Sequence, residues 1–301
     1  MMSGRNHISV CICTYKRPAL LRRLLEELAR QETDGRFTYS IVVVDNDQWR
    51  SAEATMADFA AESTIASTYC VESRQNIALA RNKAIESAEG DFVAFIDDDE
   101  FPTRRWLVTL FEACVTYDVD GVLGPVKPHF DEAPPGWVLK GRFCERRTYP
   151  TGLVIDGKKG RTGNVLLKKR VFAADAPPFN PAFLTGEDQD FFGRMIEKGH
   201  VFIWCNEALA YEIVPPIRWK RGFMMRKAML GGSISRLHPT FGLLEVVKSL
   251  AAVPTYAAGL PVALALGHHR FMGCLIRLCE HLGKLLALIG IRPVTEPYVT
   301  E

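Results

Sequence analysis

Residues 92–99 read FVAFIDDD, a run of five apolar residues that ends in three adjacent carboxylates, with Glu100 directly after them. Two carboxylates about 5 Å apart at an effective dielectric of ~20 repel each other by roughly 3 kcal/mol. Bulk water, a helix N-terminus, a basic partner or a bound cation must offset this repulsion. The stretch therefore predicts a buried strand that ends in a group of acidic side chains.

The first third of the chain alternates predicted strands and helices. Strands are predicted over 7–13 (HISVCIC), 40–47 (SIVVVDND) and 91–99, and helices over 18–32, 76–90 and 102–117. Pro18 and Asn76 mark helix starts, and Gly90 marks a helix end. Continuous apolar strands separated by helices are typical of an α/β fold with a mostly parallel sheet that is covered on both faces.

Three polar segments follow the predicted strands. The first strand ends in CTYKRP, the second in Asp45-Asn46-Asp47 and the third in Asp97-Asp98-Asp99. Ligands of such sheets bind beyond the carboxyl ends of the strands, so the three segments are expected on one rim. One or two carboxylates there can hold Mg²⁺ or Mn²⁺ and leave positions for diphosphate oxygens. A solvated acidic loop is the alternative interpretation of the aspartates.

A further acidic motif, TGED at residues 185–188, begins a helix that is predicted over 187–199. Thr185 can cap this helix, with Asp188 completing a capping box near the positive end of the helix dipole. A carboxylate in the first turn also stays accessible at a cleft and can act as a general base. The sequence alone leaves both interpretations open.

Composition and charge argue against several other classes of protein. The 301 residues carry a net charge of +2, which indicates no electrostatic attraction to nucleic acid. The eight cysteines form no CxxC pair and no zinc spacing, which favours a reducing compartment. The N-terminal apolar stretch is too short for a signal peptide, so a cytosolic orientation is expected. No Walker loop is present, and no GxGxxG follows a strand.

The order and spacing of these motifs resemble those of the family-2 glycosyltransferases, the inverting enzymes of GT-A type. Within residues 7–230, the segments that carry the resemblance are VCICTYKRP, VVVDND, NIALARNKAIESAEGDFVAFIDDDEFP, RTGNVLLKK and TGEDQDFFGRM. Within this family the chain is similar to bacterial succinoglycan and exopolysaccharide glucosyltransferases of the ExoM kind. The resemblance implies a Rossmann-like GT-A domain that transfers a hexose, glucose from UDP-glucose, to a polyprenyl-diphosphate-linked oligosaccharide.

The resemblance also implies where the donor nucleotide binds. Tyr15 and Asp45 would lie against the nucleotide base, and Arg81, in ALARN, would approach the base or the diphosphate. Asp97 and Asp98 match the positions that contact the nucleoside and its ribose.

The remaining site residues follow from the same comparison. Asp99 matches the carboxylate that binds Mn²⁺ or Mg²⁺, and Asp188 matches the general base, with Glu187 beside it. Gly163 and Asn164 match a loop that lines the cleft for the donor sugar and the acceptor.

Two positions depart from the family pattern. Asn46 stands where many relatives carry a second acid, which puts base recognition at this position in doubt. Glu212 stands where many carry a histidine, and it is either a further carboxylate near the metal or a structural residue. The QxxRW signature of polymerising relatives is absent, because PPIRW lacks the glutamine. A single sugar addition is therefore expected.

The reaction expected of such a site follows from its charges. Cleavage of the sugar–nucleotide bond develops negative charge on the diphosphate, which a cation at Asp99 and a nearby arginine would stabilise. Asp188 would accept the proton of the acceptor hydroxyl. One base without a second enzymatic nucleophile predicts inversion at the anomeric carbon.

The last third of the chain has the composition of a membrane-associated segment. Residues 216–248 carry seven Lys or Arg and one acid, and residues 249–267 carry no charge. This uncharged run contains Pro254, Gly259 and Pro261, so it is expected as a kinked span, a re-entrant hairpin or a segment at the interface. A buried helix pair is the soluble alternative. A leucine repeat follows, from Phe271 to Ile289, and is typical of an amphipathic helix or a short coiled coil.

We therefore expect three parts. Residues 1–118 form the nucleotide-sugar half, 119–240 the acceptor half and 241–301 the C-terminal helices, on the cytoplasmic face of a bacterial inner membrane as a peripheral or single-span protein. A sugar-nucleotide pyrophosphorylase would need a glycine-rich basic loop near the N-terminus, and CTYKRP is not one. A non-catalytic membrane scaffold of polysaccharide assembly is the other alternative, although a scaffold needs neither Asp99 nor Asp188.

Overall fold

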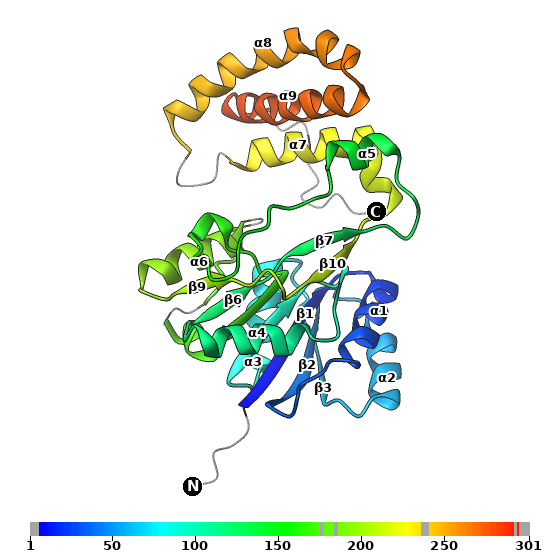
Figure 1. Cartoon of the computed structure of the whole chain (residues 1–301), viewed down its shortest axis with the longest axis vertical. Helices are drawn as coiled ribbons and strands as arrows, with labels where there is room; N and C mark the ends of the chain where they lie inside the picture. The colour runs from blue at the N-terminus through cyan, green and yellow to red at the C-terminus, as the bar shows by residue number, and fades with distance from the viewer. Residues whose placement is uncertain (1–5, 175–176, 184–185, 236–240, 292–293, 295–301) are drawn as a thin grey trace. The chain divides into compact units, whose positions relative to one another are not determined.

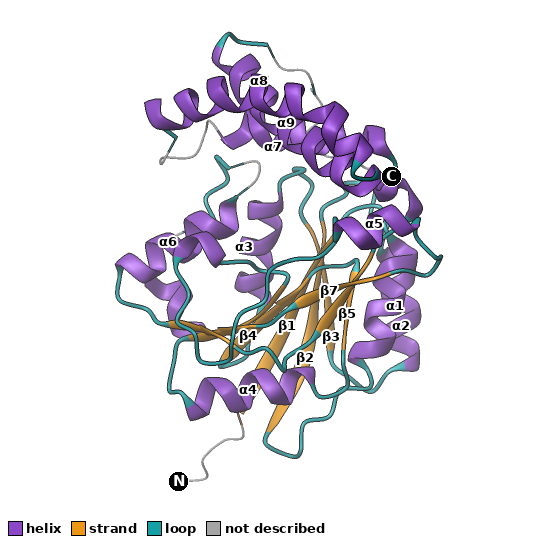
Figure 2. Cartoon of the chain, turned by 45° about the horizontal axis from the view of Figure 1, so that its top comes forward, coloured by secondary structure: helices purple, strands orange, loops and turns teal. Residues whose placement is uncertain are grey.

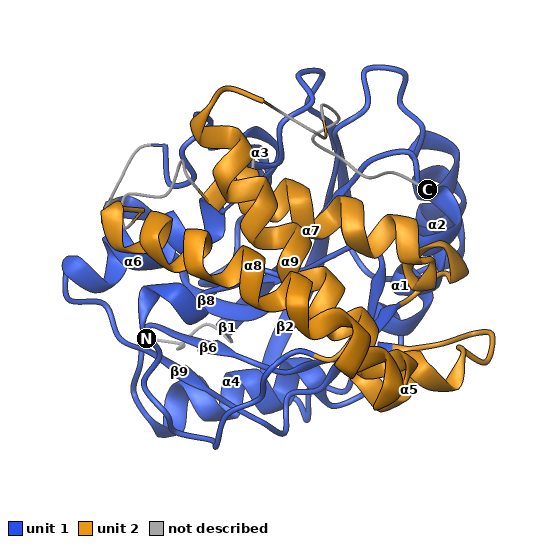
Figure 3. Cartoon of the chain, turned by 90° about the horizontal axis from the view of Figure 1, so that it is seen from above, with its two compact units in different colours: residues 1–128, 146–213 blue, residues 129–145, 214–301 orange. Residues whose placement is uncertain are grey.

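The structure is a computed structural model (Figure 1). It describes residues 6–174, 177–183, 186–235, 241–291 and 294. The chain forms two compact units, which Figure 3 shows in different colours. Unit 1 comprises Met1–Pro128 and Arg146–Ile213, and unit 2 comprises His129–Glu145 and Val214–Glu301.

A seven-stranded sheet in the order β3-β2-β1-β4-β8-β6-β9 is the centre of unit 1 (Figure 2). Its strands are β1 (Asn6–Thr14), β2 (Phe37–Asp45), β3 (Ser67–Val71), β4 (Phe92–Ile96), β6 (Gly121–Leu123), β8 (Asn164–Lys168) and β9 (Phe202–Trp204). Strand β1 pairs in parallel with β2 and β4, β2 with β3, and β6 with β9. Strand β8 is antiparallel to both β4 and β6. The mostly parallel α/β sheet is confirmed, and β8 is the exception within it.

Helices cover both faces of this sheet. The helices on one face are α1 (Pro18–Leu28), α2 (Glu53–Glu62) and α4 (Trp106–Thr116), and those on the other are α3 (Ile77–Ser87) and α6 (Glu187–Glu197). Side chains alternate along a strand, so Ile8, Val10 and Ile12 of β1 join the first core and Cys11 joins the second. Burial on both faces explains why the strands read as continuous apolar runs.

A second, three-stranded sheet has the order β5-β10-β7. Its strands are β5 (Glu100–Pro102), β10 (Ala210–Ile213) and β7 (Val126–His129). The helix predicted over 102–117 was therefore wrong at its start, since α4 begins at Trp106. Strand β5 pairs antiparallel with β10, far away in the sequence, and this pairing holds Glu100–Pro102 extended. Short 3₁₀ segments η1 (Gly157–Lys159) and η2 (Lys169–Ala174) flank β8.

Helix α3 starts as predicted and ends earlier. The Asn76 side chain accepts hydrogen bonds from the backbone N–H groups of Ala78 and Leu79, which confirms it as the N-cap. The helix ends at Ser87, so Gly90 is not its stop. A Cβ at Gly90 would lie 2.7 Å from the carbonyl oxygen of His7, and this close approach of two backbones requires glycine.

Two elements between β2 and α3, namely α2 (Glu53–Glu62) and β3 (Ser67–Val71), were not predicted from the sequence. Helix α2 buries only Met56 and Phe59, so its apolar stripe is too narrow to stand out in the sequence. Strand β3 lies at the edge of the sheet and is only partly buried. Both elements form mainly because they pack against neighbouring elements, since the apolar pattern of their own sequences is weak.

Unit 2 is helical in the part that the structure describes. Its elements are α5 (Gly136–Gly141), η3 (Pro216–Trp219), α7 (Arg221–Ser235), α8 (Leu243–Ala265) and α9 (His268–Leu288). Helices α7 and α9 touch through their backbones, because a Cβ at Gly283 would lie 2.2 Å from the carbonyl oxygen of Met229. The predicted leucine repeat lies on α9 except for Ile289, its C-cap residue, and of the members of the repeat only Leu278 is buried.

Helix α8 is 23 residues long and is apolar enough, by length and composition, to cross a membrane. It is one continuous helix with Pro254 and Pro261 inside it. Within the most apolar part of the helix, 6% of the residues are buried in the protein. This low burial does not fit the interpretation of the segment as a buried helix pair.

Candidate functional site

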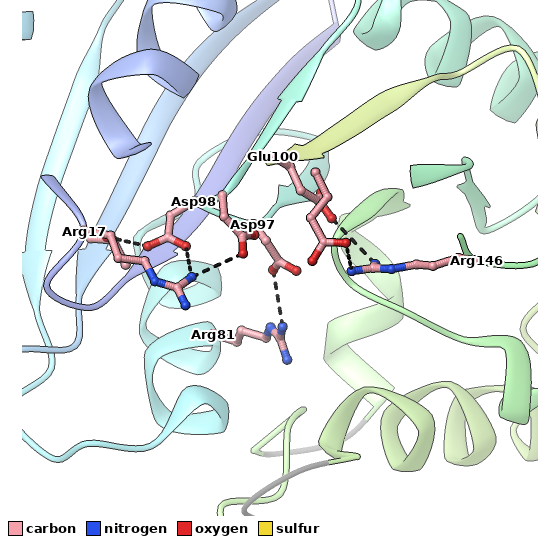
Figure 4. A network of polar contacts seen from close by, with 9 residues as sticks. Arg17, Arg81, Asp97, Asp98, Glu100 and Arg146 are labelled. Atoms are coloured by element: carbon pink, nitrogen blue, oxygen red, sulfur yellow. Dashed lines mark hydrogen bonds and ion pairs between the residues drawn. The ribbon is translucent and has the colours of Figure 1, made fainter. Parts of the chain in front are cut away.

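The aspartates after β4 meet an arginine from the turn between β1 and α1 (Figure 4). Arg17 Nη1 lies 3.1 Å from Asp98 Oδ1 and 3.3 Å from Asp99 Oδ2. The Thr14 hydroxyl donates a hydrogen bond of 2.8 Å to the other oxygen of Asp98. Burial raises the pKa of Asp98 to about 6, although Arg17 and Thr14 both favour its charged form. The carboxyl ends of β1 and β4 thus share one polar site, as predicted.

Asp97 has a different partner from the other two aspartates. Asp98 and Asp99 contact Arg17, whereas Asp97 contacts Arg81 of helix α3. Asp97 Oδ1 lies 3.7 Å from Arg81 Nη2, and Arg81 also forms an ion pair with Glu187 at the start of α6. Burial raises the pKa of Asp97, and Arg81 opposes that increase. Arg81 therefore connects the aspartates to the first turn of α6, which also carries Asp188.

Glu100 is a buried carboxyl with incomplete polar contacts. Neither of its oxygens has a hydrogen-bond partner among the described residues, and Arg146 Nη1 lies 3.7 Å from Oε1. Arg146 also forms an ion pair of 2.7 Å with Glu212, which lies directly opposite Glu100 in the β5–β10 pair. Burial and the nearby Asp97 raise the pKa of Glu100 well above its usual value.

Gly163 lies against the same carboxyl groups. A Cβ at this position would lie 2.8 Å from Oε1 of Glu100 and 2.9 Å from Oδ2 of Asp97. The backbone of the predicted cleft loop therefore approaches two acidic side chains closely, and a larger residue at this position would have to displace their carboxyl groups.

Asn164 is buried at the start of β8. Its amide nitrogen donates to the carbonyl oxygens of Pro125 (2.9 Å) and Ala208 (2.8 Å), and its oxygen accepts from the Trp106 indole (2.8 Å). The side chain thus joins three segments of unit 1. A role of this residue in the donor or acceptor cleft stays a prediction.

At the end of β2, Asp45 fixes the turn that follows. Its carboxylate accepts hydrogen bonds from the backbone N–H of Ala52 (2.7 Å) and Asp47 (3.0 Å) and from the Tyr69 hydroxyl (3.0 Å). Tyr15 is half-buried after β1, with the Lys16 ammonium 5.1 Å from the centre of its ring. Both residues lie at the predicted rim.

Asn46 has a structural role that its position in the family pattern does not suggest. Its amide nitrogen donates to the carbonyl oxygens of Glu72 (2.8 Å) and Arg74 (2.7 Å), and its oxygen accepts from the backbone N–H of Asn76 (2.9 Å). A carboxylate cannot donate the first two bonds. The asparagine therefore fixes the segment that leads into helix α3.

Replacing Asn46 by aspartate is expected to lower the free energy of unfolding by roughly 2–4 kcal/mol, because two partly buried carbonyl groups lose their donor beside a new buried charge. Urea unfolding measures this change. Asn206→Asp, at an exposed position, is the matched control and should change stability little. An unchanged midpoint in Asn46→Asp would show that the amide is dispensable.

The proposed base lies in the first turn of α6. Asp188 is half-buried, and its Oδ1 accepts a hydrogen bond of 2.7 Å from the backbone N–H of Gln189. The helix begins at Glu187 as predicted, and Gly186, with a φ of 82°, is its N-cap. Gly186 therefore occupies the N-cap position that was predicted for Thr185; Thr185 itself lies outside the described residues.

The donor atoms of this site fit a hard divalent cation. Asp97, Asp98 and Glu100 have raised pKa values and Glu100 has oxygens without hydrogen bonds, so the negative charge here is incompletely compensated. Carboxylate oxygens are the ligands that Mg²⁺ and Mn²⁺ prefer. Within the described ranges, no three His, Cys, Asp or Glu side chains are assembled around a metal position.

Three charged residues of this site, Arg17, Glu100 and Arg146, were not predicted from the sequence. Arg17 lies in the CTYKRP segment on the predicted rim, so its position gave a usable signal. Glu100 directly follows the aspartates, but its burial depends on pairing with β10. Arg146 comes from an irregular stretch, and nothing in its local sequence marks it.

The sequence is similar to those of known proteins over most of its length. The succinoglycan biosynthesis protein ExoM of Rhizobium meliloti is 29% identical over 300 residues, which are 96% of this chain and 95% of that protein. The galactofuranosyltransferase GlfT1 of Mycobacterium tuberculosis is 28% identical over 210 residues, 65% of this chain and 67% of that protein.

Solved structures share the fold at low sequence identity. The mannosyltransferase PcManGT of Pyrobaculum calidifontis, in complex with GDP-Man and Mn²⁺, superposes with a TM-score of 0.63 at 19% identity, over 94% of this chain and 88% of that chain. S. aureus TarS 1–349 in complex with UDP gives 0.53 at 16% identity, over 95% and 92%. The architecture is the GT-A fold. Residues 9–168 match the family described as Glycosyl transferase family 2, and the chain belongs to that family.

Proposed function

We propose that this glycosyltransferase moves a hexose from a UDP-sugar, with inversion, to a lipid-linked oligosaccharide in bacterial exopolysaccharide biosynthesis. The observation that carries the proposal is the contact of Arg81 with both Asp97 and Glu187, which brings the aspartates and the first turn of α6 to one site. The similarity to ExoM over nearly the whole chain supports the polysaccharide context. Glucose as the transferred sugar rests on the resemblance to this kind of enzyme.

Each charged group has one part in the proposed reaction. Residues 1–118 bind the donor, with Tyr15 and Asp45 near the base and Asp97 and Asp98 near the ribose. A divalent cation at Asp99, when bound, supplies charge neutralisation of the leaving diphosphate. Asp188 accepts the proton of the acceptor hydroxyl, which then attacks the anomeric carbon from the side opposite the diphosphate.

The test is transfer of labelled glucose from UDP-glucose to lipid-linked oligosaccharides extracted from an exopolysaccharide-producing bacterium. We expect label in the organic phase as a β-linked product, in the presence of Mn²⁺ or Mg²⁺. Use of a different UDP-sugar would change the donor but keep the reaction class. Formation of UTP from UDP-glucose and pyrophosphate would instead support a nucleotidyltransferase.

We further propose that α8 attaches the protein to the cytoplasmic face of the inner membrane. Its outward-facing apolar side chains include Leu250 (59% exposed) and Val262 (62% exposed). Basic residues precede it in the sequence, and such residues favour anionic lipid. Membrane attachment suits an acceptor built on a polyprenyl diphosphate.

Co-sedimentation with phosphatidylglycerol-containing vesicles tests this attachment. We expect the protein in the pellet, and the variant with Leu250→Glu and Val262→Glu in the supernatant. Leu139→Glu, at a similarly exposed leucine of α5 (53%), is the control and should stay in the pellet. Wild-type protein in the supernatant would contradict the proposal.

A further inference from the structure

Helix α3 and its N-cap residue contact the described segment that leads into α6 at two residues, Phe179 and Pro181. The Asn76 amide donates to the carbonyl oxygen of Pro181 at 3.0 Å. The Asn82 amide pairs with both backbone groups of Phe179, at 2.8 and 2.9 Å. Arg81, between them in sequence, forms the ion pair with Glu187. Polar side chains on α3 and at its N-cap therefore contact both the segment before α6 and the first residue of α6.

The side chains of Arg81 and its partner Glu187 are both buried. The Arg81 side chain is 8% exposed, and that of Glu187 is 7% exposed. Its guanidinium lies 5.7 Å from the centre of the Phe179 ring and reaches Asp97 with its other nitrogen. A guanidinium has five donors in a fixed fork, so it can engage two carboxylates from two different elements at once.

We propose that Arg81 is a positioning residue that couples the aspartates after β4 to the general base on α6. It holds Glu187, and with it Asp188, at a fixed place relative to Asp97. This inference rests on the proposed function and deepens it. It assigns to Arg81 a task different from the direct contact with donor base or diphosphate that family resemblance implies.

The physical reason lies in the cost of a buried charge without its partner. Removing the guanidinium leaves Glu187 as an uncompensated buried carboxylate, which turns toward water and moves the first turn of α6. A misplacement of about 1 Å lowers the rate of a chemical step about 10²-fold. Arg81 contacts one residue of the proposed donor site, Asp97; Tyr15, Asp45 and Asp98 are also proposed to bind the donor, so donor affinity should change much less than kcat.

Four variants test the coupling: Arg81→Gln, Arg81→Lys, Glu187→Gln and the double variant Arg81→Gln/Glu187→Gln. We expect kcat about 10²-fold lower in both glutamine variants, with the donor Kd from titration calorimetry changed less than about threefold. The double variant should be no worse than either single one, because both remove the same interaction. Arg81→Lys keeps the charge without the fork and should recover part of kcat. Arg74→Gln, at an exposed arginine before α3 (73%), is the matched control.

Other outcomes would overturn the inference. A donor Kd raised more than about tenfold by Arg81→Gln, with kcat unchanged in Glu187→Gln, would make Arg81 a donor ligand. Where Arg81→Gln does not fold, two other variants distinguish a positioning residue from a donor ligand. They are Glu187→Gln and Arg81→Met/Glu187→Leu, which removes both charges.

Failure of the proposed function itself has a different signature. Wild-type protein would then transfer no sugar from any donor. Hydrogen exchange of the amides of residues 187–192 would still report on the ion pair. Faster exchange in Arg81→Gln than in wild type and Arg74→Gln would support the positioning role, and equal exchange in all three would overturn it.

Discussion

Sugar transfer by the Asp188→Asn variant is expected to fall about 10²- to 10⁴-fold, the usual contribution of a general base. Asparagine has nearly the same shape and cannot accept a proton at neutral pH. The first turn of α6 should persist, since Gly186 and Glu187 begin the helix independently of this side chain. The donor Kd should therefore stay close to the wild-type value while kcat falls, as steady-state kinetics and calorimetry can show.

Asp190→Asn is the matched control, because Asp190 lies in the same turn and forms an ion pair of 2.9 Å with Arg194. This change should cost little activity. An equal loss in both variants would indicate damage to α6, and full activity in Asp188→Asn would remove the base from Asp188.

The second large effect is expected for Asp99→Asn, in the stability of the protein with its donor. A UDP-sugar at about 100 times its Kd adds roughly 2.7 kcal/mol to the free energy of unfolding. We expect this gain in the wild type only when Mn²⁺ or Mg²⁺ is present. Asp99→Asn should lose the gain, because one carboxylate of a shared ion site is gone. Thermal unfolding with and without the cation measures it.

Asp118→Asn serves as the control, since its side chain is 93% exposed and pairs with Lys168. It should keep the full cation-dependent gain. If no nucleotide or nucleotide sugar stabilises the wild type, the protein does not bind a donor, and the scaffold alternative becomes the leading one.

The sequence predicted the fold where a residue's environment is set by its own neighbours. Strands β1, β2 and β4 are buried on both faces, so each appears as a short apolar run. The Asn76 side chain caps α3 by accepting hydrogen bonds from the backbone N–H groups of Ala78 and Leu79, two and three residues further along the chain. Strand β5 could not be predicted, because Glu100–Pro102 is extended only through its pairing with β10.

The functional site, too, could be predicted only where it depends on local sequence. The rim of aspartates follows from the rule that parallel strands end at one edge of the sheet. The charges that balance it come from other parts of the chain, and Arg146 lies in a stretch without pattern. Asn46 departs from the family pattern, and the structure gives the physical reason: its amide nitrogen donates hydrogen bonds to the carbonyl oxygens of Glu72 and Arg74.

The opposed pair Glu100 and Glu212 also constrains how this enzyme can evolve. Two like charges directly across antiparallel strands are unfavourable, and Arg146 is the cation that faces both. A lineage that lost Arg146 first would pass through an intermediate in which two opposed carboxyls lack the cation they share, and selection should act against it. Replacement of either glutamate must therefore precede replacement of the arginine. Among descendants of this sequence, the three positions should change as a group and in that order.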